Sequence, residues 1–251
     1  MHRKTVIDFR ALGERYTFTQ PIKELKTRDL AEVADLLAQV ESYQEQGYYV
    51  VGYVSYEAAP AFEEKLAVHS GPLLGEYLLY FTIHEEVETL PFPEDYEAVD
   101  LPANWKEEVE APAYRKAIET IQHHIRQGDT YQVNYTVQLS QELKADPLAI
   151  YNRLVVEQRA HYNAFIQHDD VSILSISPEL FFEQDDRLLT TRPMKGTTRR
   201  GLTNQTDLQE AAWLEADSKN RAENMMIVDL LRNDMNRISE IGSEQVTRLC
   251  Q

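Results

Sequence analysis

The sequence predicts an α+β protein in which antiparallel sheets are flanked by helices. Strand-like runs follow one another closely between residues 161 and 193, and residues 207–238 are helical almost throughout. Two amphipathic helical stretches also lie upstream, at residues 29–47 and 113–129. With 251 residues, of which 43% are hydrophobic, the chain can build the core of one large domain or two small ones.

The first hundred residues contain one predicted helix, two predicted strands and a proline-rich stretch. Residues 29–47 (DLAEVADLLAQVESYQEQG) repeat Leu and Val at helical spacing, and Gly47 offers a stop. Residues 48–58 (YYVVGYVSYEA) and 75–86 (GEYLLYFTIHEE) have the composition of strands. Residues 87–112 hold four prolines among many acids, which predicts a linker or long surface loop and a domain boundary.

The second half begins with a helix at residues 113–129, followed by a strand at residues 130–143 (TYQVNYTVQLSQEL), which alternates apolar and polar side chains. Four shorter strands are predicted next, and the last three of them are expected to form an antiparallel meander: residues 161–169, 171–177, 179–186 and 187–193. Two helices end the chain, and Asp217 is expected to cap the second one, which begins near Ser218.

The charge of the chain excludes several classes of function. The 42 acidic residues outnumber the 25 Lys and Arg, which gives a net charge of −17 and disfavours binding to nucleic acids or anionic membranes. The single cysteine, Cys250, cannot form an internal disulfide, and no stretch approaches the length of a membrane span. We therefore predict a soluble cytoplasmic protein, which needs a local positive site to handle an anionic small molecule.

One short stretch runs against this acidic background. Residues 190–201 (TTRPMKGTTRRG) carry Lys195 and three arginines and no acid. Gly196 permits close approach of a ligand, and successive amides in such a turn can bind a carboxylate. Like charges nearby favour the neutral form of Lys195, which is a nucleophile. The alternative is an ordinary solvated basic turn.

Two carboxylates are further candidates for chemistry. Glu223 lies on an otherwise apolar helical face, which suggests a metal ligand or a general acid or base. The alternative for Glu223 is a surface ion pair with Arg221 or Arg232. Glu179 opens a predicted strand directly after Pro178, and its alternative is an exposed acid at the end of a strand.

Four motifs together resemble the family of chorismate-utilising enzymes, because they occur in the order typical of that family. They are GDTYQVNYT (128–136), SPELFF (177–182), TRPMKGTTRRG (191–201) and NRAENMMIVDLLRNDMNRI (220–238). The resemblance covers residues 114–251, and residues 50–65 are also similar to upstream sequence in the group. It implies an α/β/β/α sandwich of two antiparallel sheets flanked by helices. Residues 1–111 would be its N-terminal region and residues 112–251 the N-terminal half of the chorismate-binding catalytic domain.

Two positions make the chain look most like the aminodeoxychorismate synthases within this family. Gln132 stands where family members that use water as nucleophile carry Lys, and Lys195 stands where anthranilate synthases carry Ala. The resemblance implies amination of chorismate at C4 to 4-amino-4-deoxychorismate, in p-aminobenzoate and folate biosynthesis. The resemblance implies that Lys195 is the nucleophile, Glu179 the general acid/base and Glu223 a Mg²⁺ ligand. It implies substrate contacts for Gly196, Thr197 and Gln132.

The resemblance also implies partners. Because no Cys–His amidotransferase pattern occurs, ammonia is expected from solution or from a glutamine amidotransferase subunit. Family members continue with a segment that supplies another Mg²⁺-binding Glu, so the chain is expected to be a fragment with little activity alone. The alternatives are an anthranilate synthase component I and a non-catalytic fragment that only binds a ligand or partner. Tryptophan binding is not expected, since residues 161–163 read HYN.

Overall fold

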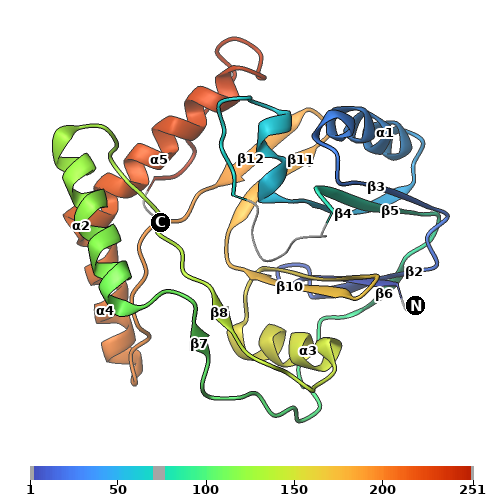
Figure 1. Cartoon of the computed structure of the whole chain (residues 1–251), viewed down its shortest axis with the longest axis horizontal. Coiled ribbons are helices and arrows are strands. Elements are labelled where there is room, and N and C mark those ends of the chain that lie inside the picture. Colours follow the sequence, from blue (N-terminus) through green and yellow to red (C-terminus); the bar gives the residue numbers. More distant parts are fainter. Residues whose placement is uncertain (1–2, 70–76, 250–251) are drawn as a thin grey trace. The chain divides into compact units, whose positions relative to one another are not determined.

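The computed structural model describes residues 3–69 and 77–249, which form helices and antiparallel strand pairs (Figure 1). Contacts divide the chain into two compact units. The first comprises Met1–Arg159 and Asn163–Ser175, and the second Ala160–Tyr162 and Ile176–Gln251. The division between the two units therefore does not fall between residues 111 and 112. The expected division of the family's domains at that point stays a prediction. Cys250 lies outside the described residues.

The first unit contains two sheets. One has five strands in the order β10-β9-β1-β2-β6, and the other has three in the order β3-β5-β4. The strands of the larger sheet are β10 (Val171–Ser177), β9 (Tyr162–His168), β1 (Lys4–Phe9), β2 (Glu14–Thr19) and β6 (Glu88–Pro91). The strands of the smaller sheet are β3 (Lys23–Thr27), β5 (Leu79–His84) and β4 (Tyr49–Val54).

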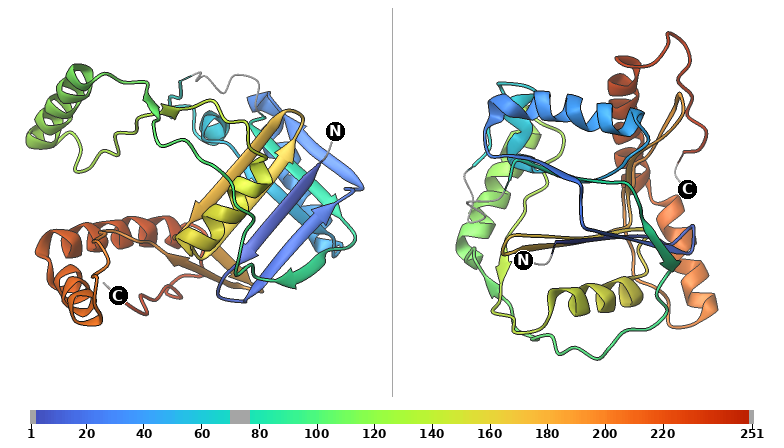
Figure 2. Two further views of the ribbon diagram at one scale, coloured as in Figure 1. Left: turned by 90° about the horizontal axis from the view of Figure 1, so that it is seen from below. Right: turned by 90° about the vertical axis from the view of Figure 1, so that its right-hand side faces the viewer.

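A helix covers the outer face of each sheet. Helix α1 (Val33–Glu45), preceded by the short helix η1 (Leu30–Glu32), packs Val33 and Val40 against buried residues of the smaller sheet. Helix α3 (Pro147–Gln158) packs Tyr151 against Phe165 of β9, with ring centroids 5.6 Å apart. The layers therefore follow the order α/β/β/α, as the right-hand view of Figure 2 shows. This confirms the predicted fold class.

The space between the two sheets is aromatic and partly polar. Tyr80 of β5 and Ile166 of β9 are buried there with Tyr77. His168 of β9 lies 4.3 Å from Tyr80, measured between ring centroids, and its Nε2 is 2.9 Å from the hydroxyl of Tyr53 on β4. The sheets are thus joined by side-chain hydrogen bonds as well as by apolar packing.

Two expectations for the middle of the chain were wrong. The predicted strand at residues 130–143 is reduced to β8 (Leu139–Ser140), which pairs with β7 (Lys106–Glu107). The rest of it alternates as a strand should, but no described strand lies beside it to complete a ladder. The predicted linker at residues 87–112 includes β6, which pairs with β2 because its backbone extends along that sheet edge. Helix α2 (Ala111–Gln127) forms as predicted and buries none of its residues.

The second unit consists of a hairpin and two helices. The elements are β11 (Leu180–Asp185), β12 (Leu188–Arg192), α4 (Asn204–Ala216) and α5 (Ser218–Asn236). Asp217 caps α5 as predicted, since its side chain accepts from the amide of Asn220 at 2.9 Å. The expected three-stranded meander is wrong: β11 and β12 form a sheet of their own, whereas the strand before them, β10, belongs to the larger sheet. Pro178 lies between β10 and β11 and has no amide hydrogen to donate to a strand ladder.

Within residues 3–69 and 77–249, no helix has both the length and the apolar character that a membrane crossing needs.

Candidate active site

The turn that carries Lys195 is held at its start by Glu179. The hairpin of β11 and β12 sets Leu180 opposite Arg192, so the residue before one strand lies close to the residues after the other. The amide of Met194 donates a hydrogen bond to Oε1 of Glu179 at 2.9 Å. Antiparallel pairing therefore places a carboxylate directly beside the backbone of the predicted nucleophile.

The same turn is held at its other end by helix α5. Gly196 has φ of 77°, in the left-handed region that favours glycine. A Cβ atom built on Gly196 would lie 2.9 Å from Cγ of Asn220, so the first turn of α5 packs directly on this glycine. Glu223 follows Asn220 by three residues, and residues at this spacing lie on the same helix face.

The second unit thus brings together most of the predicted site. Lys195, Gly196 and Thr197 form the turn, Glu179 bonds to it, and the α5 face that carries Glu223 begins against it. Lys195 and Gly196 are half-buried, whereas Thr197 and Glu179 are exposed. These positions fit the predicted roles, which themselves stay predictions.

Each of the three arginines around Lys195 forms an ion pair with an acid, which the sequence did not predict. Nε and Nη2 of Arg200 donate to the two oxygens of Asp207 at 2.7 and 2.5 Å. The same carboxylate accepts from the amide of Gly201, and these hydrogen bonds lower the pKa of Asp207. The other two pairs are Arg199–Glu210 at 3.1 Å and Arg192–Glu183 at 3.8 Å.

Hydrogen bonds from Thr198 and then from Arg199 lower the pKa of Glu210 in the same way. Because each arginine has its own carboxylate, the three arginines add little positive charge of their own to the turn. Lys195, by contrast, has no ion-pair partner within the part of the chain that the structure describes. It is therefore the one cation of the stretch whose charge is not offset by a neighbouring acid.

Glu223 forms an ion pair, but not with either arginine named from the sequence. Its Oε1 lies 3.8 Å from Nζ of Lys219, one helical turn earlier. Among the described residues no three His, Cys, Asp or Glu side chains gather as a metal site. Glu223 is therefore not part of such a cluster among the described residues, and its role as a Mg²⁺ ligand stays a prediction.

Gln132 belongs to the first unit and is not among the residues that the second unit gathers. It is half-buried, and its backbone carbonyl oxygen accepts a hydrogen bond from the hydroxyl of Thr130 at 3.1 Å. Its predicted contact with substrate stays a prediction.

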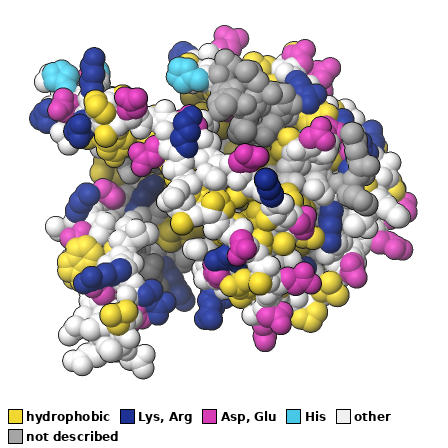
Figure 3. Space-filling view, turned by 60° about the horizontal axis from the view of Figure 1, so that its bottom comes forward, with side chains coloured by type: hydrophobic (Ala, Val, Ile, Leu, Met, Phe, Trp, Pro, Cys, Tyr) yellow, Lys and Arg dark blue, Asp and Glu magenta, His cyan; other side chains and the backbone are white. Residues whose placement is uncertain are grey.

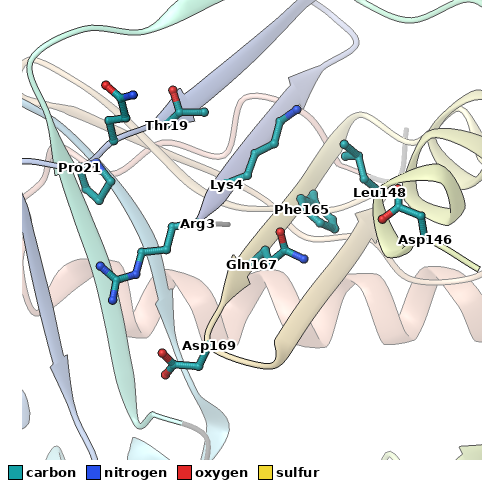
Figure 4. Close-up of a pocket in the computed structure, with 10 residues that line it drawn as sticks. Arg3, Lys4, Thr19, Pro21, Asp146, Leu148, Phe165, Gln167 and Asp169 are labelled. Atoms are coloured by element: carbon teal, nitrogen blue, oxygen red, sulfur yellow. The ribbon is translucent and has the colours of Figure 1, made fainter. Parts of the chain in front are cut away.

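A pocket of about 800 Å³ lies in the first unit and contains none of the predicted site residues. Arg3 and Lys4 line it and point in different directions, Lys4 toward the side of Leu148 at the start of α3 and Arg3 away from it (Figure 4). Both signs of charge line it, since Asp146 and Asp169 accompany the two cations, and Arg3 is already paired with Glu24 at 2.9 Å. This charge balance gives no particular preference for a dianion.

Three residues of the site were missed in the sequence. Asp207 and Glu210 neutralise arginines seven and eleven residues away, and Asn220 contacts Gly196 from a different element. No local pattern pairs residues at such separations. The one available signal was composition: an acidic helix start directly follows the basic stretch.

Comparison with known proteins decides the family. The model of the chorismate binding enzyme family matches residues 3–251 of this chain. The chain belongs to this family. Among curated members, it is 41% identical over 133 residues to aminodeoxychorismate synthase component 1 of Bacillus subtilis (strain 168), covering 53% of this chain and 28% of that protein.

Two further relatives carry the names of two different enzymes. Aminodeoxychorismate synthase component 1 of Escherichia coli (strain K12) is 36% identical over 149 residues, or 59% of this chain and 33% of that protein. Anthranilate synthase alpha subunit 2, chloroplastic, of Arabidopsis thaliana is 35% identical over 144 residues, or 57% and 23%. These matches span about a third or less of each relative's length.

A solved structure of the family has the same fold. Anthranilate synthase component I from Streptococcus pneumoniae TIGR4 superposes with a TM-score of 0.76 and 23% identity, over 94% of this chain and 64% of that one. The chain thus spans less than two thirds of that structure.

Proposed function

We propose that the chain contributes the nucleophile-bearing part of an aminodeoxychorismate synthase, which aminates chorismate at C4. The observation that carries this proposal is Lys195, a half-buried amine without an ion-pair partner among the described residues, on a turn bonded to Glu179. Overall similarity does not choose between the two amine-transferring activities, since both names occur among the relatives. Lys195 favours the aminodeoxychorismate synthase activity, because an enzyme with alanine at this position has no nucleophile there.

The proposed reaction has two displacements. The neutral amine of Lys195 forms a bond to C2 of the ring, both double bonds of the ring shift, and the C4–O bond breaks. Glu179 donates a proton to the departing oxygen, which leaves as water. Ammonia then forms a bond to C4, both double bonds shift back, and the C2–N bond to Lys195 breaks. The proton that ammonia loses restores the acid or the lysine for the next cycle.

The decisive experiment is to look for the covalent intermediate. Incubation with chorismate and Mg²⁺ in the absence of ammonia should add one chorismate less one water to Lys195, detected by peptide mass spectrometry. The adduct should be absent in Lys195→Ala and present in Lys144→Ala, which changes an exposed lysine. The measurement should be made on this chain and on the complete gene product if that is longer. Full turnover by Lys195→Ala would refute the covalent role.

Mg²⁺ is proposed to bind Glu223 together with oxygen atoms of the substrate. Mg²⁺ in proteins is commonly held by one or two carboxylates, substrate groups and water, and it would offset the negative charge of the substrate. Glu223→Gln should therefore raise the Mg²⁺ concentration needed for chorismate binding. Glu215→Gln, on exposed helix α4, should not.

Ammonia is proposed to come from a glutamine amidotransferase subunit. The proposal rests on the sequence, whose single cysteine has no amidotransferase motif around it. The purified protein should use ammonium salts but not glutamine until such a subunit is added. Efficient use of glutamine by the protein alone would contradict this.

A second candidate is ligand binding without catalysis. It is favoured by the lack, among the described residues, of a cluster of acids around Glu223. Calorimetry separates the two: heat of chorismate binding without an adduct on Lys195 would support this candidate over the enzyme.

A further inference from the structure

We infer that Asn220 is a positioning residue for Lys195, an inference that rests on the proposed function. Asn220 lies on the first turn of α5, and its side chain fills the space behind Gly196, the residue next to Lys195. It would act on the lysine through the backbone of the turn rather than by touching substrate.

The contact leaves no room between the two elements. A Cβ atom on Gly196 would lie 2.9 Å from Cγ, 3.0 Å from Oδ1 and 3.1 Å from Cβ of Asn220. The Asn220 side chain therefore occupies the space that the side chain of any residue other than glycine at position 196 would need. Positive φ and lack of space both require glycine here, so the turn can take up few other conformations.

Asn220 is itself held in place. Its amide donates to Oδ2 of Asp217, the residue that caps α5, at 2.9 Å. The cap fixes the first turn of the helix, and the first turn presents the Asn220 side chain to Gly196. A chain of short contacts thus connects the helix start to the turn.

The two ends of the turn are therefore anchored by different elements. Glu179 holds the amide of Met194 on one side of Lys195, and Asn220 abuts Gly196 on the other. With the residues before and after it fixed, the direction in which Lys195 leaves the backbone is also fixed. Loss of the Asn220 side chain should leave one anchor and release the other.

The test measures Lys195 without any substrate. Trace acetylation by acetic anhydride, read by peptide mass spectrometry, gives the relative reactivity of every lysine in one sample at each pH. In Asn220→Ala we expect the reactivity of Lys195 and its pH profile to change several-fold, while Lys106, Lys116 and Lys144 of the first unit react as before. Asn220→Leu keeps a side chain of similar size without adding charge and should react like the parent protein. Asn236→Ala, at the other end of α5, is the matched control.

An unchanged profile of Lys195 in Asn220→Ala would overturn the inference. So would an equal change at all lysines, since that would show general loss of structure. In the active protein the variant should lower kcat with little effect on KM. If no turnover or adduct is found at all, the proposed function fails, but the labelling result still decides whether Asn220 positions Lys195.

Discussion

At the scale of single residues, Asp8 is a buried carboxylate of the first unit whose stability depends on its hydrogen-bond partners. It is fully buried on β1 and accepts from Nε and Nη2 of Arg15 at 2.7 and 2.8 Å and from the hydroxyl of Tyr151 at 2.7 Å. Asp8→Asn would leave Arg15 without its counter-charge, and we expect a loss of about 3 kcal/mol in the free energy of unfolding. Urea denaturation measures this. Asp35→Asn on exposed α1 is the control, and an equal effect of both changes would contradict the argument.

His168 should make the stability of the first unit depend on pH. Burial lowers its pKa below 6.5, although Asp169, 3.9 Å away, acts in the opposite direction. Burial lowers the pKa of His84 too. An unfolded chain takes up these protons near pH 6.5 while the folded chain resists them, so stability is present above pH 6.5 and falls below it.

The loss can reach about 1.4 kcal/mol per pH unit for each histidine. Urea midpoints at pH 7.5 and 5.5 should show it, and His168→Gln should reduce the slope without removing the share of His84. A midpoint that rises on acidification would show that other groups dominate.

At the scale of elements, the stretch 131–137 has the sequence of a strand without the pairing of one. Its alternate apolar side chains are all exposed, and none of its amides has a backbone partner among the described residues. We expect these amides to exchange hydrogen within seconds, while those of β9 are protected. Strong protection of residues 131–137 in the isolated chain would mean that a strand pairs with them in solution.

Periodicity was enough for some elements and not for others. Helices α1, α2 and α5 and strand β9 follow repeats that are visible locally, and the Asp217 cap follows from residue type. Helix α3 was missed although Asp146 followed by Pro147 is a helix start signal, because its many apolar residues hide the helical repeat. The prediction of a strand at 130–143 was wrong for the opposite reason. The local sequence alternates as in a strand, but a strand forms only where a neighbouring strand pairs with it.

The site divides along the same line. Lys195, Glu179 and Glu223 were found because four motifs carry the resemblance to the family. The acids that neutralise the arginines, and the contact of Asn220 with Gly196, depend on how β12, α4 and α5 fold together. Such contacts are properties of tertiary structure and have no local sequence signature.

At the scale of the whole molecule, the two units differ sharply in how much they bury. The first has two sheets with a core, whereas no residue from 176 to 249 is buried, and Phe181 is 82% exposed. Figure 3 shows hydrophobic side chains at the surface among charged ones. Because apolar burial supplies most of the stability of a fold, we expect the second unit to open first.

Limited proteolysis should therefore cut within residues 176–249 well before it cuts the sheets. The isolated chain should also bind a dye that reports exposed apolar surface, and associate at high concentration. First cuts in β1, β5 or β9 would show that the order of stability is the reverse.

The pairing of the three arginines also bears on the order of events in the proposed reaction. With Arg192, Arg199 and Arg200 each matched to an acid, the side-chain charge left to attract a carboxylate to this turn, beside the proposed Mg²⁺, is that of Lys195. The protonated amine attracts an anion but cannot attack carbon, and the neutral amine attacks but no longer attracts. The Nζ atom of Lys195 would therefore first attract the substrate as a cation and then attack it as a neutral amine. In the proposed reaction, binding and attack would then be separated by one proton transfer.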